Sequence, residues 1–258
     1  MKEIKTITFI GAGNVATHLA KALYKANISI NQVYSKSFKN ANALAKKVNA
    51  QPIENLSQLN TRTDLIIIAV PDDTIETVVK NIAIKDKLMV HTSGSVDLGV
   101  FKKGAFKSIG IFYPLQTFSK SKALNLQEVP ICIEANSKSN LALLNTLANK
   151  LSNKVYEISS VQRQQLHLAA VFACNFSNNM YQIAFDICRN NNIDFNILKP
   201  LIKETAQKIE TIEPKLAQTG PAKRNDASTI LKHLDLLQNQ KNYQDIYQLI
   251  TQNIQKDS

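Results

Sequence analysis

One stretch decides the fold, and it reads Ile7-Thr8-Phe9-Ile10-Gly11-Ala12-Gly13-Asn14-Val15-Ala16-Thr17-His18-Leu19. The apolar run at its start predicts a strand, and the helical spacing of the apolar residues from Val15 onward predicts a helix. The turn between them has the pattern Gly-x-Gly-x-x-Ala. Gly11 permits the tight bend, Gly13 lets a phosphate approach the backbone, and Ala16 lets the helix pack closely on the strand. Together they predict a dinucleotide-binding domain.

The turn and the first helical turn are the predicted contact for the pyrophosphate of the dinucleotide. Backbone N–H groups at a helix N-terminus lack partners within the helix, and the helix dipole adds positive potential there. The residues assigned to this contact are Gly11, Ala12, Gly13, Asn14, Val15 and Ala16. The alternative is a glycine turn that only joins a strand to a helix.

The next predicted strand ends at Gln32-Val33-Tyr34, where such a fold meets the adenosine ribose of its cofactor. NAD-specific sites usually place a carboxylate here, and this segment has none. It carries Ser35, Lys36 and Ser37 instead, whose hydroxyl and ammonium groups suit a 2′-phosphate. The sequence therefore favours NADP over NAD. The alternative for Lys36 is an ordinary solvated lysine in a turn.

Two further strands are expected to bring their carboxyl ends to the same edge. Asp64 to Val70 is apolar without alternation, as in a central parallel strand covered on both faces, and Leu88 to His91 follows it. Open α/β sheets bind ligands beyond the carboxyl ends of their strands. The residues assigned to the cofactor at these ends are Val70, Pro71, Asp72, Thr92 and Ser93, with His91 beside the nicotinamide or the substrate. The alternative at His91 is a strand-to-helix turn with an N-cap.

Alternating strand and helix patterns continue to Ile158 and then stop. They predict a doubly wound, mostly parallel sheet of the Rossmann type, with its last strands at Ser108–Phe118, Pro130–Ala135 and Lys154–Ile158. Only helical periodicity remains after that, with helices expected at Ser160–Asn190, Phe195–Ile212, Ala227–Gln238 and Tyr243–Ile254. The expected organisation is an α/β domain over residues 1–158 and an all-α domain over residues 159–258.

The composition is that of a globular protein without membrane spans. Of its 258 residues 44% are hydrophobic, and no apolar run approaches the ~20 residues that a membrane helix needs. The start at Met1 shows no signal-peptide core, so a cytoplasmic location is expected. Cys132, Cys174 and Cys188 form no zinc or disulfide motif, and no metal site is predicted.

The net charge of +11 arises from 31 lysines and arginines against 20 acidic residues. The lysines are scattered, and no basic block is interleaved with aromatic residues, so no nucleic-acid partner is expected. The charge favours anionic ligands, which include a phosphorylated cofactor and a small anionic substrate.

The long predicted helix carries the candidate catalytic side chains His167 and Asn175. At ~100° per residue, His167, Asn175 and Asn178 fall on one face of an α-helix. Histidine side chains ordinarily titrate near pH ~6.5, so His167 or His91 is the expected general acid or base. The alternatives are a solvated polar helix face and a histidine satisfied by a backbone carbonyl.

A loop near the C-terminus supplies a candidate substrate contact. Arg224 precedes a predicted helix whose N-cap is Asp226, and its guanidinium is suited to clamp a substrate carboxylate. The alternative is a salt bridge within the loop. Tyr113 and Asn178 are the other candidate substrate contacts.

Five motifs occur together in this chain, at Gly11–Ala16, His91–Ser95, Tyr113–Phe118, His167–Ala170 with Asn175, and Thr219–Asp226. In these motifs the chain resembles a family of Rossmann-like NADP-binding proteins with a helical C-terminal domain of unknown function. That family is related to pyrroline-5-carboxylate reductase and to the deazaflavin-dependent NADP oxidoreductases. The resemblance implies a reductase or dehydrogenase whose helical domain forms a homodimer and completes the active site. It implies no particular substrate.

Three departures from related families limit which of their reactions this chain is expected to share. The Tyr113 position is often histidine in similar proteins, and Val171 stands where related hydroxyacid dehydrogenases have a lysine. Residues 219–226 also lack the glycine- and threonine-rich motif of pyrroline-5-carboxylate reductase, which argues against that substrate.

The function expected from the sequence is hydride transfer between NADP and a small substrate with a C=O or C=N bond. The rival hypothesis is a non-catalytic dinucleotide-binding sensor or scaffold. The missing lysine and Tyr113 motivate this rival.

Overall fold

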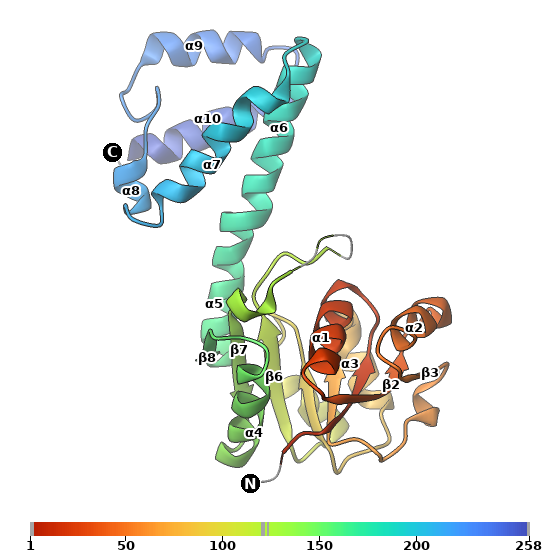
Figure 1. Cartoon of the computed structure of the whole chain (residues 1–258). Coiled ribbons are helices and arrows are strands. Elements are labelled where there is room, and N and C mark those ends of the chain that lie inside the picture. Colours follow the sequence, from red (N-terminus) through yellow and green to blue (C-terminus); the bar gives the residue numbers. More distant parts are fainter. Residues whose placement is uncertain (1–2, 120–121, 123, 257–258) are drawn as a thin grey trace. The chain divides into compact units, whose positions relative to one another are not determined.

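The structure is a computed structural model that describes residues 3–119, 122 and 124–256 (Figure 1). The chain divides into two compact units, Met1–Cys174 and Asn175–Ser258. The expected boundary after residue 158 would put the helix that starts at Ser160 into the C-terminal domain. In the structure this helix belongs to the first unit, because its polar side chains bond to the sheet and its loops.

An eight-stranded sheet forms the centre of the first unit, with the strand order β3-β2-β1-β4-β5-β6-β7-β8. The strands are β1 (Thr6–Ile10), β2 (Ser29–Tyr34), β3 (Gln51–Ile53), β4 (Leu65–Ile68), β5 (Leu88–His91), β6 (Ile109–Pro114), β7 (Ile131–Ala135) and β8 (Val155–Glu157). Every neighbouring pair is parallel except β6 with β7. The predicted fold class is confirmed, although β6 ends at Pro114 and not at Phe118.

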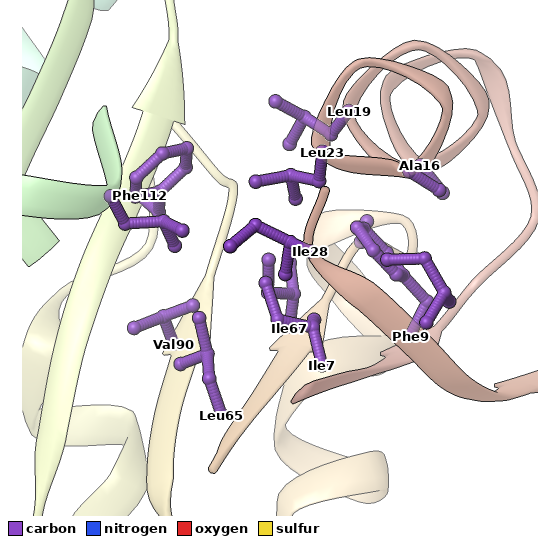
Figure 2. Packing of buried hydrophobic residues seen from close by; sticks show 14 of the residues in the cluster. Ile7, Phe9, Ala16, Leu19, Leu23, Ile28, Leu65, Ile67, Val90 and Phe112 are labelled. Atoms are coloured by element: carbon purple, nitrogen blue, oxygen red, sulfur yellow. The ribbon is translucent and has the colours of Figure 1, made fainter. Parts of the chain in front are cut away.

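Helices cover both faces of this sheet, which is why its central strands are apolar on both sides. Side chains alternate along β4, so Ile67 belongs to a cluster with Leu19 of α1, and Ile66 to a second cluster with Ile75 of α3. Figure 2 shows the side chains of α1 meeting those of β1 and β4 in the first cluster. The helices of this unit are α1 (Asn14–Lys25), α2 (Phe38–Ala45), α3 (Asp72–Asn81), α4 (Lys138–Asn149) and α5 (Ser160–Ala170).

The second unit is helical, and residues 175–256 as described contain no strand. Its helices are α6 (Ser177–Asn190), α7 (Lys199–Lys208), α8 (Pro214–Ala217), α9 (Ala227–Leu236) and α10 (Lys241–Lys256). Across the described part of the chain, none of the helices combines the length and the apolar character that a membrane crossing requires.

The helical run expected from Ser160 to Asn190 contains a change of helix type. Residues Val171–Phe176 form a π-helical turn between α5 and α6. Since a π-helical turn holds more residues than an α-helical turn, the uniform ~100° spacing does not apply across it. The shared face of His167, Asn175 and Asn178 therefore stays a prediction.

Candidate functional site

The glycine turn after β1 has the backbone that the sequence predicts. Gly11 has a φ of +119°, and a Cβ there would lie 2.0 Å from the carbonyl oxygen of Ala69, so only glycine fits. The N–H of Gly11 donates to the carbonyl of Tyr34 at 2.7 Å, which ties the turn to β2. Gly13 is exposed, and a Cβ there would meet no atom within 4 Å. Free space therefore lies over Gly13, where a phosphate is expected.

Helix α1 begins directly after this turn, with Gly13 as its N-cap, and among the described residues no side chain caps its first amides. Ala12 and Ala16 are buried, so their small side chains pack against the sheet. Asn14 directs its side-chain amide to the carbonyl of Phe118 at 2.9 Å. Uncapped amides at the positive end of a helix are suited to a pyrophosphate. The residues of this turn therefore fit the predicted cofactor.

Three polar residues follow β2 at the predicted ribose position. Ser35 is half-buried, whereas Lys36 and Ser37 are exposed. Ser37 is the N-cap of α2, but its hydroxyl makes no capping hydrogen bond. Because no carboxylate lies between Tyr34 and Phe38, this corner fits a 2′-phosphate better than a free 2′-hydroxyl.

The loops that follow β4 and β5 are bonded to each other. The hydroxyl of Ser95 donates to Oδ2 of Asp72 at 2.5 Å. Ser93 is buried, and its hydroxyl oxygen accepts from the N–H groups of Ser95 and Val96 at 3.1 and 3.0 Å. Ser93 therefore shapes the loop with its side chain, and its predicted contact with the cofactor stays a prediction. Of the other residues assigned here, Val70 is half-buried, Pro71 is exposed and Thr92 is buried.

His91 is enclosed by the protein, contrary to the ligand-facing place that the sequence predicts. Its side chain is 0% exposed, stacks on Phe101 with 5.5 Å between ring centroids, and accepts at Nδ1 from the N–H of Ser93. Burial, and next the charge of Arg163, lower the pKa of His91 to about 4. The ring is therefore neutral at pH 7 and helps to hold the loop after β5. A strand-to-helix turn, the alternative reading of this segment, describes it better.

His167 is paired with Tyr113, which lies at the carboxyl end of β6. The Tyr113 hydroxyl lies 3.1 Å from Nδ1 of His167, and the two rings meet edge to face. Tyr113 packs with Ile111 and Cys132 in a small buried cluster. Burial above all raises the pKa of Tyr113 to about 12. A neutral phenol thus engages one nitrogen of a half-buried histidine at the ligand edge of the sheet.

Gly94 lies directly against this pair. A Cβ at Gly94 would come within 2.6 Å of Nδ1 of His167 and 2.8 Å of Cζ of Tyr113. Any side chain at this position would push the two rings apart. The loop after β5, the end of β6 and helix α5 therefore converge here. Gly94 follows His91 in the segment that the sequence places near the nicotinamide or the substrate, and this role stays a prediction.

A row of polar side chains fastens α5 to this edge, and sequence analysis missed it. Arg163 is fully buried, with Nη1 2.6 Å from Oε2 of Glu134 and Nη2 donating to the carbonyl of Val96. Gln164 donates to the carbonyl of Ser95 at 2.9 Å. The docking residues of α5 are Ser160, Arg163, Gln164 and His167. Their i, i+3, i+4, i+7 spacing is the signal that could have found them.

The remaining predicted residues belong to the second unit. Asn175, Asn178 and Arg224 are exposed, and Asp226 caps α9 by accepting from the N–H of Thr229 at 3.1 Å. The N-cap assigned to Asp226 is therefore confirmed. The roles of Asn175 in catalysis, and of Asn178 and Arg224 in substrate binding, stay predictions.

Comparison with known proteins agrees with this geometry. A family model described as "NADP oxidoreductase coenzyme F420-dependent" matches residues 6–94, and the model "Domain of unknown function (DUF2520)" matches residues 129–254. A solved structure from Bacteroides fragilis, described as a "putative NADP oxidoreductase", is 42% identical to this chain. Its TM-score is 0.90, and 98% of each chain is covered. The chain belongs to this two-domain NADP oxidoreductase family.

Members of more distant oxidoreductase groups share the fold of this family. An imine reductase from Myxococcus stipitatus, solved with NADP+, is 16% identical with a TM-score of 0.67, over 97% of this chain and 93% of that one. A 1-pyrroline-5-carboxylate reductase from Streptococcus pyogenes is 15% identical with a TM-score of 0.65, over 98% and 99%. No curated protein matches the chain. The resemblance drawn from the five sequence motifs is thereby confirmed.

Proposed function

We propose that this family member is an NADP-dependent oxidoreductase that transfers hydride between the nicotinamide and a small substrate with a C=O or C=N bond. One observation carries the proposal: an open glycine turn and a histidine held by a neutral phenol occur at the carboxyl ends of strands in one sheet. The first feature suits a dinucleotide and the second suits proton transfer.

The turn from Gly11 to Ala16 is the proposed pyrophosphate contact, since Gly13 is open and the first amides of α1 are uncapped. Ser35, Lys36 and Ser37 are the proposed contacts for the 2′-phosphate, which favours NADP over NAD. The Myxococcus stipitatus neighbour was solved with NADP+, which is consistent with this choice.

His167 is the proposed acid and base. A bound nicotinamide cofactor supplies or accepts the hydride, and the protein contributes orientation and proton transfer. Histidine is suited to this task because it changes charge near neutral pH. A small substrate of anionic character remains favoured by the basic chain.

A homodimer through the C-terminal helices is part of this proposal, and the exposed apolar residues of the second unit support it. Leu216 and Leu236 are each 76% exposed, and Leu231 is 66% exposed. Helices α6 and α10 also border an apolar cavity of about 260 Å³, lined in part by Ile183, Ile187 and Ile250. Exposed apolar surface of this kind marks a site of association. Light scattering after size-exclusion chromatography is expected to give twice the chain mass of 28.7 kDa.

Nucleotide binding and turnover test the function together. Calorimetry with NADPH and NADH is expected to show binding, with NADPH the tighter ligand. Absorbance of the reduced nicotinamide is then followed with cyclic imines and keto acids, and at least one class should consume it. Binding without consumption of NADPH would favour the sensor hypothesis. Absence of binding of both nucleotides to the folded protein would refute a dinucleotide site.

A further inference from the structure

Tyr113 is bonded to the proposed acid and base of the site. The sequence assigns it to the substrate, but its side chain is 8% exposed and its hydroxyl is 3.1 Å from Nδ1 of His167. We infer that Tyr113 is a positioning residue that holds Nδ1 of His167 and so makes Nε2 the nitrogen that exchanges a proton with the substrate. This inference rests on the proposed role of His167.

Packing fixes the phenol ring. Tyr113 pairs with Cys132 across the antiparallel strands β6 and β7, and both belong to a buried cluster with Ile111. Leu98 and Leu166 pack against this cluster, and Leu166 precedes His167 in α5. A ring held by its neighbours places its hydroxyl at one point in space. A hydrogen bond to that hydroxyl therefore sets the orientation of the imidazole.

The loop after β5 packs against Nδ1 of His167 from another side. The position of a Cβ on Gly94 is 2.6 Å from Nδ1 of His167 and 2.8 Å from Cζ of Tyr113. The backbone of Gly94 therefore packs directly on both partners of the hydrogen bond. Nδ1 is enclosed by Tyr113 and Gly94, and Nε2 is the ring nitrogen that remains for the substrate.

A phenol can bond to the imidazole in both of its protonation states. It accepts from Nδ1–H of the imidazolium and of the neutral ring that forms when Nε2 gives up its proton, and it donates to Nδ1 of the other neutral tautomer, whose proton is on Nε2. Because burial raises the pKa of Tyr113 to about 12, the phenol keeps its own proton near neutral pH. Nδ1 thus stays bonded while His167 gains and loses charge.

The reaction balances when a bound nicotinamide would supply the hydride and solvent returns the proton to His167. In the direction of reduction, hydride adds to the substrate carbon and the π-electron pair moves to the oxygen or nitrogen. That atom takes the proton from Nε2 of the imidazolium, which becomes neutral imidazole. Nδ1–H stays hydrogen-bonded to the phenol oxygen during the transfer, so the neutral imidazole keeps its proton on Nδ1. Nε2 then regains a proton from solvent.

Tyr113→Phe tests the inference, because it removes the hydroxyl and keeps the packed ring. With NADPH and the best substrate of the panel, kcat is expected to fall roughly tenfold or more while KM and NADPH binding stay within about twofold. Tyr113→His is expected to restore part of kcat, since imidazole also donates and accepts. The matched control is Tyr156→Phe in β8, whose side chain is 51% exposed and which should leave kcat unchanged.

Nitrogen NMR of His167 gives a readout that needs no activity. The Nδ1 resonance is expected to move towards that of free imidazole in Tyr113→Phe and to stay in place in Tyr156→Phe. An unmoved resonance, or an unchanged kcat in Tyr113→Phe, would overturn the positioning role. If the wild type consumes no NADPH, the proposed function fails, and the NMR result still decides whether Tyr113 holds Nδ1. If Tyr113→Phe does not fold, the wild type decides, because an Nδ1 resonance equal to that of free imidazole would overturn the positioning role.

Discussion

Arg163 of α5 is fully buried, and its Nη1 lies 2.6 Å from Oε2 of Glu134 in β7. The same guanidinium donates through Nη2 to the carbonyl of Val96 in the loop after β5. One side chain therefore joins a helix, a strand and a loop, and it lies one helical turn before His167. This placement makes the ion pair part of what holds the proposed acid at the edge of the sheet.

Breaking this ion pair is expected to be costly. Arg163→Met leaves the partly buried carboxylate of Glu134 without its cation and with the hydroxyl of Ser160 as a remaining donor, and we expect a loss of about 3–5 kcal/mol in the free energy of unfolding. Urea denaturation measures it. Arg189→Met is the control, because Arg189 is 65% exposed in its pair with Asp186. This substitution should lower the free energy of unfolding by less than ~1 kcal/mol. Similar losses for both variants would contradict the structural role of the buried pair.

Gly94→Ala is expected to disturb the proposed site more than the fold. The added methyl group would press on His167 and Tyr113, at a cost of roughly 1–3 kcal/mol in stability and with a marked loss of kcat. In Gly99→Ala the new methyl group meets only the side chain of Asp97, which accepts from the N–H of Gly99 at 2.6 Å. It would disturb this hydrogen bond but neither His167 nor Tyr113, so activity should persist. Thermal unfolding and NADPH consumption are the two measurements. Full activity of Gly94→Ala would show that the rings tolerate displacement.

Gly11 and Gly13, in the turn after β1, should respond to substitution by alanine in opposite ways. Gly13→Ala meets no atom, so stability is expected to stay within ~0.5 kcal/mol while NADPH binding weakens. Gly11→Ala collides with the carbonyl of Ala69 at a positive φ, and should lose ~2 kcal/mol or more. Calorimetry and urea denaturation separate the two effects. Unaltered NADPH binding by Gly13→Ala would place the pyrophosphate elsewhere.

Lys36 is expected to distinguish the two nicotinamide cofactors. Lys36→Ala removes one cation from the proposed 2′-phosphate contact, so the Kd of NADPH should rise about tenfold, or ~1.4 kcal/mol. The Kd of NADH should not change. Lys46→Ala serves as the control, since Lys46 is exposed at the other end of α2. An equal loss for both nucleotides would assign Lys36 to a different part of the cofactor.

Because His91 is buried, we expect the free energy of unfolding to fall in mild acid. Its pKa is about 4 in the folded protein against 6.5 for an ordinary histidine, so between these values only the unfolded chain binds the proton. A difference of one pKa unit corresponds to ~1.36 kcal/mol. The whole interval therefore corresponds to roughly 3 kcal/mol of unfolding free energy, which is lost as the pH falls from 6.5 towards 4. Urea denaturation at pH 7 and pH 4.5 measures it in wild type and His91→Asn. The variant should lose less, and an equal loss would assign the effect to other groups.

Local patterns predicted much of this protein correctly. The Gly-x-Gly-x-x-Ala turn, the apolar strand before it and the continuous apolar run of β4 led to a parallel sheet with its ligand edge at the strand ends. Such features depend on neighbouring residues, because backbone strain at Gly11 and burial on both faces of a strand impose their own composition. The all-α C-terminal segment followed from helical spacing for the same reason.

The sequence by itself therefore determined the fold class, the dinucleotide turn and the helical second unit. Only the tertiary structure paired Tyr113 with His167, buried Arg163 against Glu134 and enclosed His91 behind Phe101. The spacing of the polar residues along α5 could have marked the face that carries Arg163 and His167, but it names no partner, since either partner alone has the same pattern as a solvated residue. Their meeting depends on how strands, loops and helix converge, and this convergence is set by packing of the whole unit.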